Sequence, residues 1–196
     1  MSLNKSLGKL IISRARLTLL DVFFSHPKDS FYIRELVRLT KEEINSIRRE
    51  LENLKSAGVL TSEKRGNRVF YSVDAGFPFF QNLLALMAKV TGLGGKIVER
   101  RTLLGDIKFV IFSGHFLRWE DRKAEVDFLI VGKVVLPEIG KLVVEEEAER
   151  KREINYAVMD LNEFKIRKRS RDPFLTNILL NNPVVVLGDE QELARL

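Results

Sequence analysis

The side chains best suited to recognition chemistry lie between residues 40 and 71. Asn45, Ser46 and Arg49 recur at a spacing that places them on one side of a helix, opposite the apolar residues Ile47 and Leu51. Arginine and asparagine have the geometry for paired hydrogen bonds with guanine and adenine in the major groove of DNA. The pattern predicts base contacts, although a solvated helix face has the same residue types.

Basic side chains surround this helix and a short hairpin that follows it. Those expected to contact phosphates are Lys41, Arg48, Lys64, Arg65 and Arg68. The last three flank Gly66-Asn67, a two-residue turn typical of a β-hairpin, and segments 59–64 and 69–73 have the composition of its two strands. We therefore expect a basic hairpin whose tip can lie along a nucleic-acid backbone.

Three helices must position these groups. Apolar spacing predicts helices at 9–24 and 33–39, and Thr40 with Glu43 three residues later has the pattern of a capping box, which predicts that the third helix starts at Thr40. Ala57-Gly58 would end it.

The order of three helices and a basic hairpin has a known counterpart. Together with the phrase Leu-Glu-Asn-Leu-Lys-Ser-Ala-Gly-Val-Leu at 51–60, it resembles the winged helix-turn-helix of ArsR-like bacterial and archaeal regulators. The resemblance implies that residues 1–75 form a DNA-binding domain whose partner is double-stranded DNA. A winged helix used only for protein contacts or dimerisation is the alternative.

Composition and charge agree with a DNA partner and exclude several other classes. The chain has 196 residues and a net charge of +6, and residues 1–75 hold 14 Lys and Arg against 9 Asp and Glu. The absence of cysteine excludes disulfides, thiolate zinc sites and cysteine nucleophiles. The longest apolar-rich run, 75–88, is shorter than the roughly 20 residues that span a bilayer, so we expect a cytoplasmic protein without a membrane partner.

The chain between the two halves reads as a connection. Segment 77–90 is apolar around much of a helix, which suits a dimer interface, a seat between domains or ordinary core packing. The glycine-rich segment 91–96 lacks the residues of a phosphate-binding loop and is interpreted as a hinge or helix stop. We therefore assign 76–104 to a linker helix and hinge.

Residues 105–196 alternate strands and helices. Buried strands are predicted at 107–112, 126–131, 154–159 and 183–187, with a charged helix at 137–152. The whole chain is thus predicted as α+β, a winged helix followed by an α/β domain with a mixed sheet.

Five residues of this half lie at or near the ends of the predicted strands. They are Ser113, Gly114, Glu125, Asp127 and Asn155. Carboxylates one residue apart on a strand project from the same side and can hold magnesium when a neighbouring strand adds a third.

This segment resembles the minimal nucleotidyltransferase domain of the polymerase-beta-like superfamily, and of the functional positions only Asp127 matches outright. The Gly-Ser of that family is reversed at Ser113-Gly114, its first Asp is Glu125, and Asn155 stands at its third carboxylate. The resemblance implies a catalytically degenerate domain for dimerisation, ligand sensing, or binding of a nucleotide or protein partner. No cofactor is expected, except magnesium at Glu125 and Asp127 if the site is active. In the structural alternative, these two carboxylates lie at a strand edge and are solvated or paired with Arg118 or Arg122.

The sequence therefore predicts a DNA-binding transcriptional regulator that forms a homodimer. The alternatives are an active magnesium-dependent nucleotidyltransferase guided by a winged helix, and an adaptor without a nucleic-acid partner. A basic run at 165–171 either extends the nucleic-acid footprint or is simply solvated.

Overall fold

A computed structural model describes residues 13–120 and 126–196 of the chain. The chain divides into two compact units, of which the first ends at Met87 and the second begins at Ala88. This boundary falls inside the segment that the sequence marks as a connection. Glu125, one of the two predicted metal ligands, lies outside the described residues.

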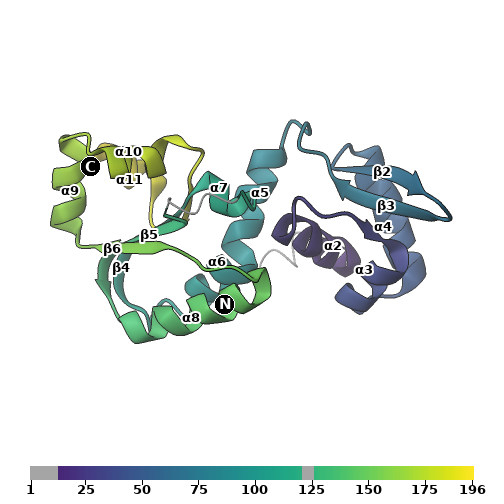
Figure 1. Cartoon of the computed structure of the whole chain (residues 1–196), viewed down its shortest axis with the longest axis horizontal. Helices are drawn as coiled ribbons and strands as arrows, with labels where there is room; N and C mark the ends of the chain where they lie inside the picture. Colours follow the sequence, from purple (N-terminus) through teal and green to yellow (C-terminus); the bar gives the residue numbers. More distant parts are fainter. Residues whose placement is uncertain (1–12, 121–125) are drawn as a thin grey trace. The chain divides into compact units, whose positions relative to one another are not determined.

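In the described part of unit 1, three helices before the wing surround an apolar centre (Figure 1). They are α2 (Arg14–Ser25), α3 (Ile33–Thr40) and α4 (Ile44–Ser56). Each buries residues at helical spacing, and Phe23, Leu36 and Leu51 are fully enclosed where the helices meet. The three predicted helices are confirmed over the described residues, and residues 9–12 of the first prediction lie outside them.

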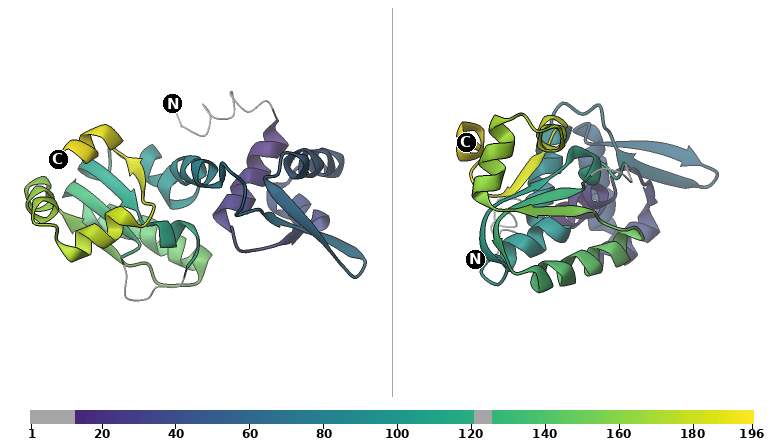
Figure 2. Two further views of the ribbon diagram at one scale, coloured as in Figure 1. Left: turned by 90° about the horizontal axis from the view of Figure 1, so that it is seen from above. Right: turned by 60° about the vertical axis from the view of Figure 1, so that its left-hand side comes forward.

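A three-stranded sheet completes unit 1. Its strands are β1 (Phe31–Tyr32), β2 (Leu60–Arg65) and β3 (Arg68–Val73), in the order β1-β3-β2 and all antiparallel. Gly66, the first residue of the turn, has a φ of +59°, which glycine adopts without steric cost. Figure 2 shows the β2–β3 hairpin extending past the helices as the wing, so the winged helix-turn-helix predicted from the sequence is confirmed.

The start of α4 differs from the prediction. Thr40 is the last residue of α3, where its hydroxyl donates to the carbonyl of Leu36 at 2.7 Å, and Lys41 follows in the left-handed region with a φ of 56°. Glu43 is the N-cap of α4. The Thr-x-x-Glu pattern therefore marks the end of one helix and the start of the next. Thr40 bonds to the backbone of α3, whereas Glu43 bonds to the backbone of α4.

The connection is helical over most of its length. α5 (Phe80–Val90) is followed after one residue by α6 (Gly92–Glu99). A Cβ at Gly94 would lie 1.9 Å from the carbonyl oxygen of Ala88, so this glycine permits close packing of two consecutive helices. The predicted helix stop is present at Thr91, but the glycines form a packed helix rather than an open hinge.

Unit 2 is built on a four-stranded sheet with the order β6-β5-β4-β7. The strands are β4 (Gly105–Phe112), β5 (Phe128–Val134), β6 (Tyr156–Met159) and β7 (Val184–Leu187). β5 and β6 are parallel, whereas β4 is antiparallel to both β5 and β7. The predicted mixed sheet is confirmed, and with it the α+β class.

Helices cover both faces of this sheet. α9 (Leu161–Arg169), α10 (Pro173–Leu180) and α11 (Glu190–Arg195) lie on one face, and α6 and α8 (Leu136–Arg150) on the other (Figure 1). Alternate strand residues point to opposite faces, and both sets are buried here, as Ile111 and Val110 illustrate. The short helix α7 (Gly114–Leu117) follows β4 directly.

Within the described residues, no helix combines the length and the apolar character that crossing a membrane requires.

Candidate nucleic-acid interface

The amino-terminal end of α4 is held by a carboxylate. One oxygen of Glu43 accepts hydrogen bonds from the backbone N–H of Asn45 at 2.8 Å and of Ser46 at 2.9 Å. These backbone hydrogen bonds hold the pKa of Glu43 below its ordinary value. The cap thus fixes the first turn of α4, which bears two of the predicted base-contacting side chains.

The predicted base-contacting residues have different surroundings. Asn45 and Arg49 are exposed on α4, whereas Ser46 is half-buried; Ser46 and Arg49 both border a depression shared with the start of α2. Arg49 lies 3.8 Å from a carboxylate oxygen of Glu50 and keeps most of its surface in solvent. Asn45 and Arg49 are therefore the predicted residues best placed to reach a base edge.

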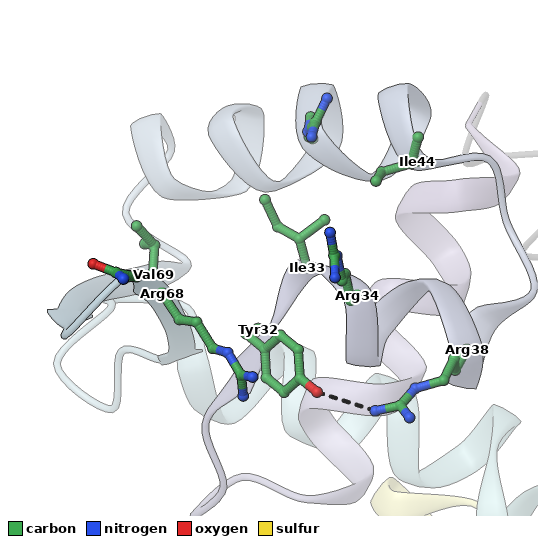
Figure 3. Close-up of a pocket in the computed structure, with 9 residues that line it drawn as sticks. Tyr32, Ile33, Arg34, Arg38, Ile44, Arg68 and Val69 are labelled. Atoms are coloured by element: carbon green, nitrogen blue, oxygen red, sulfur yellow. Dashed lines mark hydrogen bonds between the residues drawn. The ribbon is translucent and has the colours of Figure 1, made fainter.

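A groove of about 820 Å³ lies between the wing and the helices α3 and α4 (Figure 3). Four arginines line it: Arg34, Arg38, Arg48 and Arg68. No carboxylate occurs among its lining residues in the described part of the chain. Four guanidinium groups line the groove, and one of them, Arg48, also contributes to the lowered pKa of Glu43; this excess of positive charge makes the groove a site for anions.

Tyr32 orients two of these arginines. Its hydroxyl oxygen accepts a hydrogen bond from Arg38 at 3.1 Å, and the guanidinium of Arg68 lies 4.7 Å from the centre of its ring. Figure 3 shows the Tyr32 ring between the two side chains. Neither contact neutralises charge, so both arginines are positioned and remain available to an anion.

The remaining predicted phosphate contacts lie outside the groove. Arg65 forms an ion pair with Glu63 at 2.7 Å and donates to the hydroxyl of Ser30, which reduces its free charge at the wing tip. Lys64 and Lys41 are exposed and are not among the groove residues.

Sequence reasoning missed Tyr32, Arg34 and Arg38. The available signal was the i, i+4 spacing of two arginines on the polar side of the second helix. That signal does not show that the wing lies opposite, since β1 reaches the wing only through its pairing with β3.

In unit 2 the fold brings together three of the residues predicted to lie at strand ends. The hydroxyl of Ser113 donates to the carbonyl of Asp127 at 2.8 Å, and the backbone N–H of Asn155 donates to the Asp127 carboxylate at 2.9 Å. Gly114 starts α7, where a Cβ would lie 2.1 Å from the carbonyl oxygen of Asn181. A cavity of about 290 Å³ opens beside Ser113.

The Asp127 carboxylate is buried and bound by a guanidinium that the sequence analysis did not single out. Arg152 donates to Oδ1 at 2.8 Å and to Oδ2 at 3.2 Å, and Nε2 of His115 lies 3.4 Å from Oδ1. Burial alone would raise the pKa of Asp127. The hydrogen bonds from His115, Arg152 and the Asn155 backbone outweigh it and hold that pKa below its ordinary value.

This arrangement does not fit a magnesium site. A carboxylate offers about four lone-pair positions, and His115, Asn155 and the two Arg152 nitrogens supply four donors to Asp127. The described residues also contain no group of three or more His, Cys, Asp or Glu side chains that could hold a metal.

Ser113, His115 and Asp127 do not form a hydrolytic triad either. Both Ser113 and Asp127 contact the same ring nitrogen, Nε2 of His115. A triad needs the base to bind the nucleophile through one nitrogen and the carboxylate through the other. The Ser113 hydroxyl hydrogen is moreover directed to the Asp127 carbonyl.

Comparisons with known proteins give limited similarity. No family model and no curated protein matches the chain. Among solved structures, reduced HlyU from Vibrio cholerae is 18% identical with a TM-score of 0.34 and aligns over 43% of this chain and 80% of its own. M. tuberculosis Rv0081 is 25% identical with a TM-score of 0.35 over 51% and 93% of the two chains.

A third structure, human N-acetylserotonin methyltransferase in complex with SAM, is 14% identical with a TM-score of 0.30 and aligns over 63% of this chain and 38% of its own.

Proposed function

We propose that unit 1 binds double-stranded DNA and that the protein is a transcriptional regulator. The observation that carries the proposal is the groove beside α4, where four arginines face an open space without a carboxylate among the described lining residues. Such a surface attracts phosphates irrespective of base sequence.

The geometry suggests a division of contacts. With α4 in the major groove, Asn45 and Arg49 face base edges. The adjoining phosphate strand then runs between α4 and the wing, where Arg48 and Arg68 approach it from opposite sides. Lys64 and Arg65 at the wing tip, and Lys41 after α3, would contact phosphates farther along the backbone.

We further propose that the regulator is a homodimer and acts in the cytoplasm. A two-fold dimer presents two α4 helices to half-sites about one helical turn apart. Unit 2 would then be a degenerate nucleotidyltransferase-like domain that serves dimerisation, partner binding or ligand sensing. The binding of Asp127 by Arg152 supports a role without catalysis.

A titration with fluorescent DNA tests the proposal. Sequences bound by the full chain are first selected from random duplexes, and affinity is then measured at several salt concentrations for wild type, Arg48→Ala, Arg68→Ala and Lys133→Ala. Lys133 is an exposed lysine of unit 2 and controls for loss of one positive charge.

We expect each arginine variant to bind less tightly and to reduce the slope of log K against log salt by about 0.9, the value for one phosphate contact. Lys133→Ala should leave both quantities unchanged. Equal behaviour of all four proteins would refute a DNA interface at this groove.

The dimer is tested separately by light scattering during size-exclusion chromatography, which measures the mass of the protein with and without the selected duplex. A mass of one chain per duplex, or a selected sequence without two-fold symmetry, would contradict the homodimer and leave DNA binding intact.

A further inference from the structure

The buried carboxylate of Asp127 stands where the resemblance places a ligand of a divalent cation. In this chain its side chain is 2% exposed, and the positive group beside it is the guanidinium of Arg152, whose own side chain is 26% exposed. The contact is two-pronged, since each terminal nitrogen of Arg152 donates to a different oxygen of Asp127. Paired hydrogen bonds of this kind are the strongest form of the arginine–carboxylate contact.

The backbone conformation between α8 and β6 places the Arg152 side chain against Asp127. α8 ends at Arg150, and the next residue, Lys151, has a φ of 54° in the left-handed region, which is unfavourable for a residue other than glycine. The segment is then fixed at Ile154, whose N–H donates to Glu147 of α8 at 2.8 Å. Before the turn, Arg150 donates to Glu146 and to the carbonyl of Phe116, so the left-handed residue is held by contacts on both sides.

The same carboxylate also fastens two neighbouring strands. The Asp127 N–H donates to the carbonyl of Asn155 at 2.7 Å, and the Asn155 N–H returns a bond to the Asp127 side chain. These residues immediately precede the parallel strands β5 and β6. One side chain thus links the starts of two strands to the segment that leaves α8.

We infer that Arg152 permanently takes the place of a divalent cation, so that Asp127 is a structural joint between β5, β6 and the end of α8 and is closed to metal. A cation at Asp127 would have to displace a guanidinium and remove donors from both oxygens. Magnesium also requires near-ideal octahedral geometry and gives up its water ligands reluctantly. The inference concerns unit 2 alone and is independent of DNA binding.

Manganese binding by the full chain tests the closed site. Mn²⁺ serves as the probe because its paramagnetism reports bound ion directly, and the titration compares wild type with Asp127→Asn, which keeps the shape of the side chain and removes its charge. We expect wild type and Asp127→Asn to bind the same amount of Mn²⁺ at concentrations up to millimolar. A site present in wild type and lost in Asp127→Asn would overturn the inference.

Thermal unfolding tests the joint. Arg152→Met and Asp127→Asn should each lower the unfolding midpoint, and the double variant should be no less stable than the worse single variant because both changes break the same contact. Arg152→Lys keeps the charge without the two-pronged geometry and should recover part of the loss. Additive losses would overturn the joint, and if the single variants do not fold, the wild-type titration still decides whether the site is closed.

Discussion

The guanidinium of Arg16 lies 2.8 Å from a carboxylate oxygen of Glu50, and this ion pair joins α2 to the inner side of α4. Glu50 is 3% exposed although it is charged, and it also accepts from the side chain of Asn53. The proposed base-contacting face of α4 is therefore fixed in rotation by a buried charge on the flank of the same helix, next to Arg49.

Arg16→Met should destabilise unit 1 by about 1–3 kcal/mol, because it leaves the Glu50 carboxylate buried without its main partner. Arg14→Met is the matched control, two residues earlier on α2. Arg14 pairs with Glu42 at 2.9 Å but is 87% exposed, and pairs of that kind contribute about 0–1 kcal/mol. Hydrogen exchange of the α4 amides in the full chain measures both; equal protection in the two variants would contradict the assigned role.

Glu50 also predicts a pH dependence. Burial raises its pKa, but hydrogen bonds from Ser13, Arg16 and Asn53 and the charge of Arg16 together hold that pKa below 4.5, the ordinary value. A lowered pKa contributes stability that is complete above 4.5 and is lost as pH falls through the folded-state value. The stability difference between wild type and Glu50→Gln should therefore shrink as pH is lowered from 7 to 3, as denaturant unfolding can show; a constant difference would rule out this ionisation.

Arg38 tests the part of the groove that the sequence did not reveal. Arg38→Ala should weaken DNA binding at every sequence by a similar factor and lower the salt slope by about 0.9, because Arg38 lines the groove that we propose binds phosphates and not bases. Tyr32→Phe removes only the hydroxyl that orients Arg38, so it should lower affinity less. A change in preferred sequence in either variant would show that the residues contact bases.

The cap of α4 predicts a graded effect. Glu43→Ala removes the acceptor for the N–H groups of Asn45 and Ser46, whereas Glu43→Gln keeps an oxygen acceptor and loses only the charge. Exchange protection at the start of α4 should therefore fall in the order wild type, Gln, Ala. Unchanged protection in Glu43→Ala would show that another residue caps the helix.

Two glycines predict contrasting costs. Gly66 at the wing turn has open space around its Cα, so Gly66→Ala pays only for the left-handed backbone, about 1–2 kcal/mol. At Gly188, φ is +105° and a Cβ would lie 2.4 Å from the ring of Phe109, so Gly188→Ala should cost about 3 kcal/mol or more. Chemical denaturation compares the two, and a milder effect at Gly188 would contradict the packing around Phe109.

The elements of the fold were largely predictable because their signals are local. Apolar spacing identified the helices of unit 1, and the Gly66-Asn67 turn set the register of the wing, in which Arg65 lies opposite Arg68. The error at Thr40 and Glu43 is also local in origin. The same two residues can cap one helix reciprocally or end one helix and start another, and only the left-handed backbone at Lys41 separates the cases.

The sites were less predictable because they depend on contacts between distant segments. Arg152 reaches Asp127 only because β5 and β6 pair in parallel and α8, which connects them, ends just before β6. Arg38 lines the groove only because β3 of the wing pairs with β1, which leads directly into α3. Neither relationship leaves a pattern of residue types in the sequence.

The two-residue strand β1 has a consequence for how DNA would be discriminated. Phe31 pairs with Tyr71 and Tyr32 with Phe70, so the wing is hydrogen-bonded to the residues that lead directly into α3. The distance between the wing and the helices is therefore fixed by the pairing of β1 with β3. A duplex whose groove matches this separation would bind without bending, whereas any other duplex would have to deform at a cost in elastic free energy. The protein would therefore select DNA by groove width and stiffness as well as by its bases.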